Sequence, residues 1–125
     1  MIRFLLILIL ATPAFAQGHS NHPPKDQALH ETFYSTWLRP DIRVGVDRTA
    51  SCCNDKDCYP TLFKKVGGTW FAQRREDREW IAVPAAIIEQ NQPDERESPD
   101  GQSHVCMQPP NMQNKVFCAT LGTGT

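Results

Sequence analysis

The stretch that decides the fold is SCCNDKDCYP, residues 51–60, in which three of the chain's five cysteines lie close together. These are Cys52, Cys53 and Cys58, and only Cys106 and Cys118 follow. In an oxidising compartment such cysteines are typically disulfide-bonded. Because the number is odd, one thiol is left over, and about 15 pairings are compatible with the sequence.

Geometry and loop length narrow these pairings. A bond between the adjacent Cys52 and Cys53 is strained, because the Cα separation in disulfides normally exceeds about 4.4 Å. A bridge from the cluster to the C-terminal cysteines closes a loop of about 50 residues, which gives the larger stabilisation in the chain-entropy model. We therefore expect at least one bridge from Cys52, Cys53 or Cys58 to Cys106 or Cys118.

The N-terminal sequence predicts an exported protein. A short start containing Arg3 precedes an unbroken apolar run, residues 4–10, and Ala14-Phe15-Ala16 has the small-x-small pattern of a signal-peptidase site. The apolar run is much shorter than the roughly 20 residues that span a bilayer as a helix. Residues 1–16 are therefore interpreted as a signal peptide, which implies a periplasmic or secreted protein with no stable membrane span after cleavage.

The rest of the chain is predicted to form one domain. Residues 17–25 are polar, contain Pro23-Pro24 and have the composition of a disordered leader. Residues 26–119 contain all the cysteines and form a single small cysteine-stapled domain, and residues 120–125 form a flexible tail. Asp26 is a candidate cap for a helix over residues 27–38, which ends before Pro40.

After the cysteine cluster the apolar pattern changes to a period of two. Residues 59–66 and 69–73 flank Gly67-Gly68, which indicates a hairpin because glycine readily adopts the positive φ of a tight turn. Residues 78–83, 103–107 and 115–119 are predicted to be further strands. The fold class is therefore α+β, with an N-terminal helix followed by a small, mostly antiparallel β-sheet stapled by disulfides. The expected core comprises Leu29, Phe33, Trp37, Leu62, Trp70, Trp80, Ile81, Val83, Val105 and Phe117.

Charge and motifs exclude several classes of protein. The chain has 13 Lys+Arg and 14 Asp+Glu, with both signs scattered along it, so it lacks the basic patches typical of nucleic-acid-binding proteins. It has no hydrolase triad signature, no phosphate-binding loop and no H-E-x-x-H motif. We therefore assign no catalytic residues and expect no cofactor.

Metal binding is the rival interpretation. Cleavage after Ala16 exposes Gln17-Gly18-His19, whose amine, amide and imidazole nitrogens suit square-planar copper(II), and His22 follows closely. A sulfur-rich zinc or copper(I) site is a second possibility, although the sequence has no C-x-x-C pair. Its candidate ligands are Cys52, Cys53, Cys58, His104 and Cys106.

Four ordered motifs resemble those of an uncharacterised family of small exported Gram-negative bacterial proteins. The motifs are CCNDKDCYP (52–60), WIAVP (80–84), SPDGQSHVC (98–106) and VFC (116–118). Ala119 departs from the family, which usually has an aromatic residue after the last cysteine. The resemblance implies an exported, cysteine-stapled domain and supplies no activity, cofactor or catalytic residue.

We therefore expect a non-enzymatic binding or accessory protein of the cell envelope, with an envelope or extracellular partner. The alternative is a periplasmic protein that binds or handles copper or zinc. A third alternative is an enzyme that combines His104 with the unpaired thiol. Besides Trp70 and Trp80, the candidate functional residues form one loop: Ser98, Pro99, Asp100, Gly101 and His104.

Overall fold

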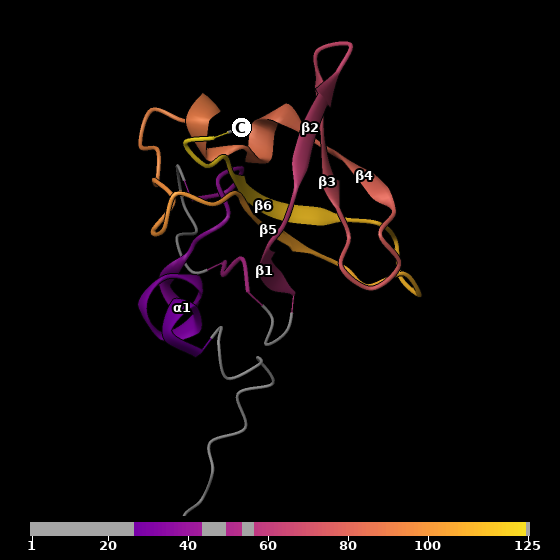
Figure 1. Cartoon of the computed structure of the whole chain (residues 1–125). Coiled ribbons are helices and arrows are strands. Elements are labelled where there is room, and N and C mark those ends of the chain that lie inside the picture. The colour runs from indigo at the N-terminus through magenta and orange to yellow at the C-terminus, as the bar shows by residue number, and fades with distance from the viewer. Residues whose placement is uncertain (1–26, 44–49, 54–56, 125) are drawn as a thin grey trace, which may run out of the picture.

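The computed structural model describes residues 27–43, 50–53 and 57–124. The predicted signal peptide, the polar leader, His19 and His22 lie outside these residues. Within them, one short helix and two small antiparallel sheets alternate with turns (Figure 1). This arrangement confirms the predicted α+β class stapled by disulfides.

The predicted helix is shorter than expected. Helix α1 covers Gln27–Thr32 and is followed by the 3₁₀ turn η2, Tyr34–Thr36, so the helix does not continue to residue 38. Hydroxyl groups compete with the helical hydrogen bonds here: Thr32 Oγ1 donates to Ala28 O at 2.6 Å, and Ser35 Oγ donates to Glu31 O at 3.1 Å. The break at Phe33 allows three aromatic rings, Phe33, Tyr34 and Trp37, to be buried together.

The strands form two sheets instead of one. The first has the order β1-β5-β6, with β1 at Cys58–Pro60, β5 at His104–Met107 and β6 at Val116–Thr120. The second has the order β2-β3-β4, with β2 at Phe63–Val66, β3 at Thr69–Gln73 and β4 at Trp80–Val83. Two 3₁₀ turns, η3 at Ala85–Ile87 and η4 at Glu89–Asn91, follow β4.

The hairpin between β2 and β3 matches the prediction. Gly67 and Gly68 form its turn with φ of 56° and 82°, and Val66 pairs with Thr69 on either side. Positive φ at both turn positions is the geometry that glycine adopts without steric cost. The diglycine therefore fixes the register of the hairpin.

The predicted strand over residues 59–66 is divided into β1 and β2. The chain changes sheets at Thr61 and Leu62: Thr61 N donates to Ser103 O beside β5, whereas Leu62 O accepts from Gln73 N of β3, each at 3.0 Å. Leu62 lies at this corner and is 66% exposed. Its assignment to the core was therefore wrong, because the period of two did not show that the chain bends here.

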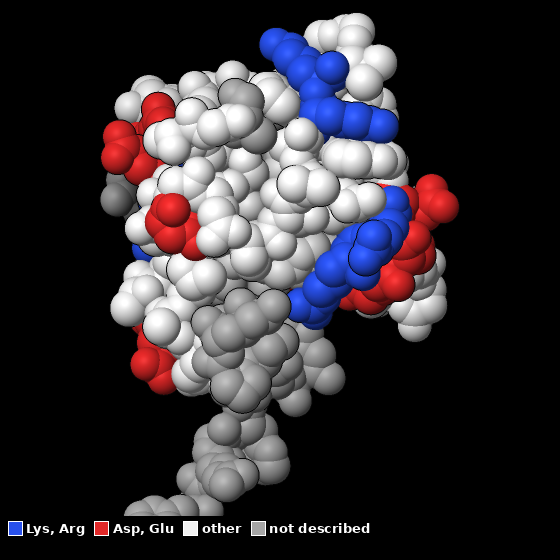
Figure 2. All heavy atoms as spheres, in the orientation of Figure 1, with Lys and Arg blue, Asp and Glu red and all other residues white. Residues whose placement is uncertain are grey.

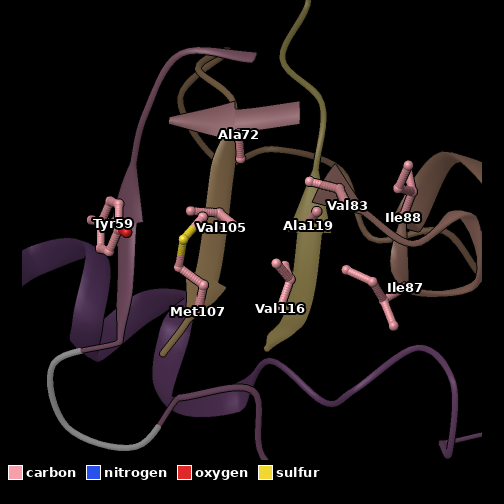
Figure 3. Packing of buried hydrophobic residues seen from close by; sticks show 9 residues of the cluster. All are labelled: Tyr59, Ala72, Val83, Ile87, Ile88, Val105, Met107, Val116 and Ala119. Carbon is pink, nitrogen blue, oxygen red and sulfur yellow. The ribbon is translucent and has the colours of Figure 1, made fainter. Parts of the chain in front are cut away.

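The sheet β1-β5-β6 is buried on both faces. The first face packs against β3, β4 and the turns after β4 (Figure 3). The buried residues of this main core are Tyr59, Ala72, Val83, Ile87, Ile88, Val105, Met107, Val116 and Ala119. The opposite face packs against the N-terminal aromatic residues and carries the cysteines. The buried residues of this aromatic–disulfide cluster are Phe33, Tyr34, Trp37, Cys52, Cys58, Cys106 and Cys118.

Most of the predicted core residues take part in these two clusters. Phe33, Trp37, Val83 and Val105 are buried. Four more are partly buried against the clusters, namely Leu29, Trp70, Ile81 and Phe117. Trp80 pairs with Gln73 at the start of β4 and is only partly buried, with the Lys64 ammonium 4.2 Å above its ring. Its packing partner is thus a lysine of the hairpin.

Candidate binding groove

Two disulfides hold the aromatic–disulfide cluster together. Cys52 pairs with Cys118 at a Cα separation of 5.7 Å, and Cys58 pairs with Cys106 at 4.0 Å. Both bridges run from the cluster at residues 52–58 to the C-terminal cysteines, which confirms the prediction of at least one such bridge. Cys53 is the remaining, half-buried thiol. The sulfur-rich metal site was wrong, because Cys52, Cys58 and Cys106 are disulfide-bonded and cannot supply thiolate ligands.

The rest of the described chain shows no metal centre either. Residues 27–43, 50–53 and 57–124 contain no group of three His, Cys, Asp or Glu side chains placed to hold an ion. The copper(II) hypothesis on His19 and His22 lies outside the described residues and stays a prediction. The candidate functional loop, residues 98–104, lies within the described residues.

Asp100 is the centre of that loop. Its carboxylate accepts hydrogen bonds from Gln102 N at 3.0 Å, from Gln102 Nε2 at 2.9 Å and from Ser98 Oγ at 3.2 Å. Burial alone would raise the pKa of Asp100, but the hydrogen bonds from His104, Gln102 and Ser98 outweigh it and hold the pKa below its ordinary value. The carboxylate is therefore ionised at neutral pH and closes the loop on itself.

His104 connects this loop to the aromatic–disulfide cluster. It is fully buried, with Nε2 2.7 Å from Asp100 Oδ1 and Nδ1 2.7 Å from the Tyr34 hydroxyl oxygen. An ionised Asp100 only accepts hydrogen bonds, so Nε2–H donates to it, and in the neutral imidazole Nδ1 accepts from the Tyr34 hydroxyl. Both ring nitrogens are thus engaged, which fits a structural role and gives no support to an enzyme in which His104 activates a thiol.

The C-terminal residues brace the same loop. Gly122 N donates to Ser103 Oγ at 2.9 Å, and Thr123 N donates to Gly101 O at 3.1 Å. Strand β6 itself ends at the buried Thr120, which is the first residue of the predicted tail, residues 120–125. These contacts make residues 101–103 and 122–124 one continuous wall.

An open groove of about 760 Å³ lies between this wall and the β2–β3 hairpin. The hairpin side consists of the consecutive residues 60–65 together with Trp70, and the opposite side consists of residues 101–103 with Gly122 and Gly124. The structure thus brings Gly101 of the predicted loop and the predicted binding residue Trp70 to one site. Ser98, Pro99, Asp100 and His104 are not in its lining. Ser98 and Asp100 hydrogen-bond to Gln102 of the wall, and His104 in turn bonds to Asp100.

The groove combines aromatic and apolar groups with positive charge. Leu62 is exposed within it. The rings of Phe63 and Trp70 pack edge to face with their centroids 6.5 Å apart, and Lys65 Nζ lies 5.7 Å from the centroid of the Trp70 ring. Lys64 and Lys65 line the groove, and none of its lining residues within the described part of the chain is acidic. Figure 2 shows basic side chains at the β2–β3 end of the molecule, beside a broad uncharged area in the middle of the same face. This surface suits a ligand that is partly apolar and partly anionic.

A second polar network lies beneath the aromatic rings and was not predicted from the sequence. Glu89 is fully buried and accepts hydrogen bonds from Trp37 Nε1 at 2.7 Å, from both terminal nitrogens of Arg43 at 2.5 and 2.6 Å, and from Arg96 N at 2.9 Å. Arg43 also pairs with Asp94 at 3.0 Å. The hydrogen bond with Glu89 is the main cause that raises the pKa of Arg43 above its ordinary value, against the effect of burial. The one sequence signal for this network was the position of the charged residue Glu89 directly after the apolar pair Ile87-Ile88.

The fold and the groove define a small disulfide-stapled α+β domain with an open surface groove. The chain gives no match to a family model, a curated protein or a solved structure. Among the described residues, no helix is long and apolar enough to cross a membrane.

Proposed function

We propose that the chain is a small exported binding domain of the cell envelope, without catalytic activity, and that the groove beside β2 is its binding site. One observation carries the proposal: an exposed leucine, two partly buried aromatic rings, two lysines and a braced main-chain wall meet in one open groove. A groove with braced walls binds with a smaller entropic cost than a mobile surface.

Several features support export. Residues 1–16 have the pattern of a signal peptide, and both disulfides join distant parts of the chain, as in many small secreted domains. The resemblance to exported proteins through the motifs at 52–60 and 98–106 points the same way. Both motifs hold bridged cysteines.

Export is tested by the intact mass of the protein made from the full sequence in a Gram-negative host. We expect a periplasmic protein that starts at Gln17, lacks about 4 Da relative to the reduced chain because of two disulfides, and gains one alkyl group at Cys53 without reductant. Metal analysis of the same sample tests the copper and zinc alternative. An uncleaved chain that stays in the cytoplasm with reduced cysteines would contradict the proposal.

Binding is tested by screening the oxidised protein against arrays of peptides and envelope polysaccharides. The test variant is Leu62→Asp, because Leu62 is 66% exposed in the groove and its replacement leaves both core clusters intact. The matched control is Met112→Asp, which places the same charge at a residue that is 56% exposed and outside the groove. We expect Leu62→Asp alone to weaken binding, and equal loss in both variants would exclude the groove.

A further inference from the structure

The free edge of β2 provides a more specific inference. β2 is an outer strand of its sheet, and among the described strands it pairs with β3 alone. The bond from Gln73 N to Leu62 O sets the alternation of the ladder, so Lys64 with Phe71 and Val66 with Thr69 are the hydrogen-bonded pairs. The main-chain N–H and C=O groups of Phe63 and Lys65 therefore point away from β3, toward the free edge.

The groove follows this edge. Residues 60–65 line it without interruption, and the wall opposite includes Gly101, Gly122 and Gly124, which have no side chains to fill the space. Adjacent strands lie about 4.8 Å apart, so an added strand would occupy the part of the groove next to β2. Main-chain hydrogen bonds to an exposed edge are a general mode of peptide recognition.

The charges on β2 select the kind of strand that can be added. Lys64 and Lys65 are consecutive, so their side chains stand on opposite faces of the strand, and apolar Phe63 and Val66 flank them. An added strand of lowest energy therefore has two consecutive acidic residues flanked by apolar ones. Pairing with β2 of a second copy is disfavoured, because it would bring the lysines of both copies together.

We propose that the groove binds an extended, acidic segment of a partner protein, which joins the sheet as an additional strand on the edge of β2. The recognised pattern is apolar-acidic-acidic-apolar, opposite residues 63–66. Because this pattern is the same in both directions, it applies to parallel and antiparallel addition. The inference rests on the proposed binding role of the groove and adds the class of ligand and its geometry.

The test uses the oxidised protein and a fluorescent peptide, Thr-Val-Glu-Glu-Val-Thr, in anisotropy titrations. The control is Thr-Val-Lys-Lys-Val-Thr. We expect the acidic peptide to bind, the double variant Lys64→Glu/Lys65→Glu to lose at least about tenfold in affinity, and the lysine peptide to bind that variant instead. A variant that had merely unfolded would not bind the lysine peptide, so this binding distinguishes a change of specificity from a loss of the fold.

A series of peptides, each N-methylated at one position, tests strand addition itself. In an added strand only alternate N–H groups face β2, so methylation should weaken binding about tenfold at one set of alternate positions and leave the other set unaffected. No binding of the acidic peptide, or equal effects at all positions, would overturn the strand-addition inference. The proposed function would still stand if the array ligands lost affinity with Leu62→Asp alone, so the two failures are distinguishable.

Discussion

At the scale of single residues, Gly122 determines the shape of the groove wall. A Cβ atom built on it would lie 2.7 Å from Gln102 C and 2.9 Å from Ser103 N, with Gly101 O closer still. These neighbours are backbone atoms, which cannot move aside as a flexible side chain would. The absence of a side chain at this position therefore allows the C-terminal residues to brace the loop.

Gly122→Ala is expected to lower the free energy of unfolding by about 1–3 kcal/mol through steric overlap. The matched control is Gly124→Ala, because a Cβ atom at Gly124 would meet nothing within 4 Å. Urea unfolding followed by tryptophan fluorescence measures both changes. Equal stability of the two variants would mean that the wall is not closely packed at Gly122.

Asp100 gives the molecule a specific dependence on pH. Its pKa in the folded protein is below the ordinary value, so its stabilising contribution is present at neutral pH and is lost as the pH falls through the folded pKa. Asp100→Asn should cost about 1–2 kcal/mol at neutral pH, because charge-assisted hydrogen bonds are lost. The difference from wild type should begin to shrink as the pH falls below the ordinary pKa of an Asp side chain, about 3.9, and should vanish below the lowered pKa of folded Asp100.

Urea unfolding of wild type and Asp100→Asn across this pH range measures the effect. Other carboxylates titrate in both proteins, among them Asp77, whose pKa is also lowered by its hydrogen bond with Arg74, so the difference between the two curves isolates Asp100. A difference that does not change with pH would show that the charge of Asp100 contributes nothing to stability.

At the scale of elements, the sequence predicted the strands better than their arrangement. The Gly67-Gly68 hairpin and β4 follow from local signals, namely turn glycines and the period of two. The division into two sheets could not be predicted, because it depends on the change of hydrogen-bond partners at Thr61 and Leu62. The same corner exposes Leu62 and opens the groove, so the candidate site was only half predicted.

The Glu89 network connects three elements that sequence reasoning left separate. It joins Trp37 after η2, Arg43 in the following turn and Arg96 in the loop after η4. Such long-range pairing leaves no periodic signal in a sequence. The network therefore became visible only in the structure, although it holds the N-terminal segment against the rest of the domain.

Glu89→Gln is expected to lower the free energy of unfolding by about 3 kcal/mol, because it leaves a buried cation only partly compensated by Asp94. Glu97→Gln, the same substitution at an exposed position, is the control and should change stability by less than about 0.5 kcal/mol. Thermal and urea unfolding measure both. If the two variants were equally stable, the buried ion pair would contribute no net stabilisation.

At the scale of the whole molecule, the two disulfides stabilise a fold made of two three-stranded sheets and the N-terminal aromatic segment. The bridges close loops with sequence separations of 66 and 48 residues. In the chain-entropy model each contributes about 4 kcal/mol. Since small domains have total stabilities of about 5–15 kcal/mol, the loss of both bridges is expected to unfold the protein.

Removing one bridge at a time tests this estimate. The double substitutions Cys52→Ala/Cys118→Ala and Cys58→Ala/Cys106→Ala should each lower the free energy of unfolding by about 4 kcal/mol, whereas Cys53→Ala keeps both bridges. Unfolding with and without reductant provides the measurement. A reduced wild-type protein that kept the circular dichroism spectrum of the folded state would show that the fold is stable without the bridges.

The order of the paired cysteines has a consequence for biosynthesis. Cys52, Cys53 and Cys58 emerge from the ribosome well before Cys106 and Cys118, with which two of them pair. Whenever oxidation begins before synthesis is complete, the three early thiols can react only with one another or with an external oxidant. A chain oxidised in this way must exchange its first bridges, and the remaining thiol of Cys53 lies beside Cys52 to take part in that exchange. Efficient production of the protein should therefore depend on disulfide isomerisation more than on the rate of oxidation.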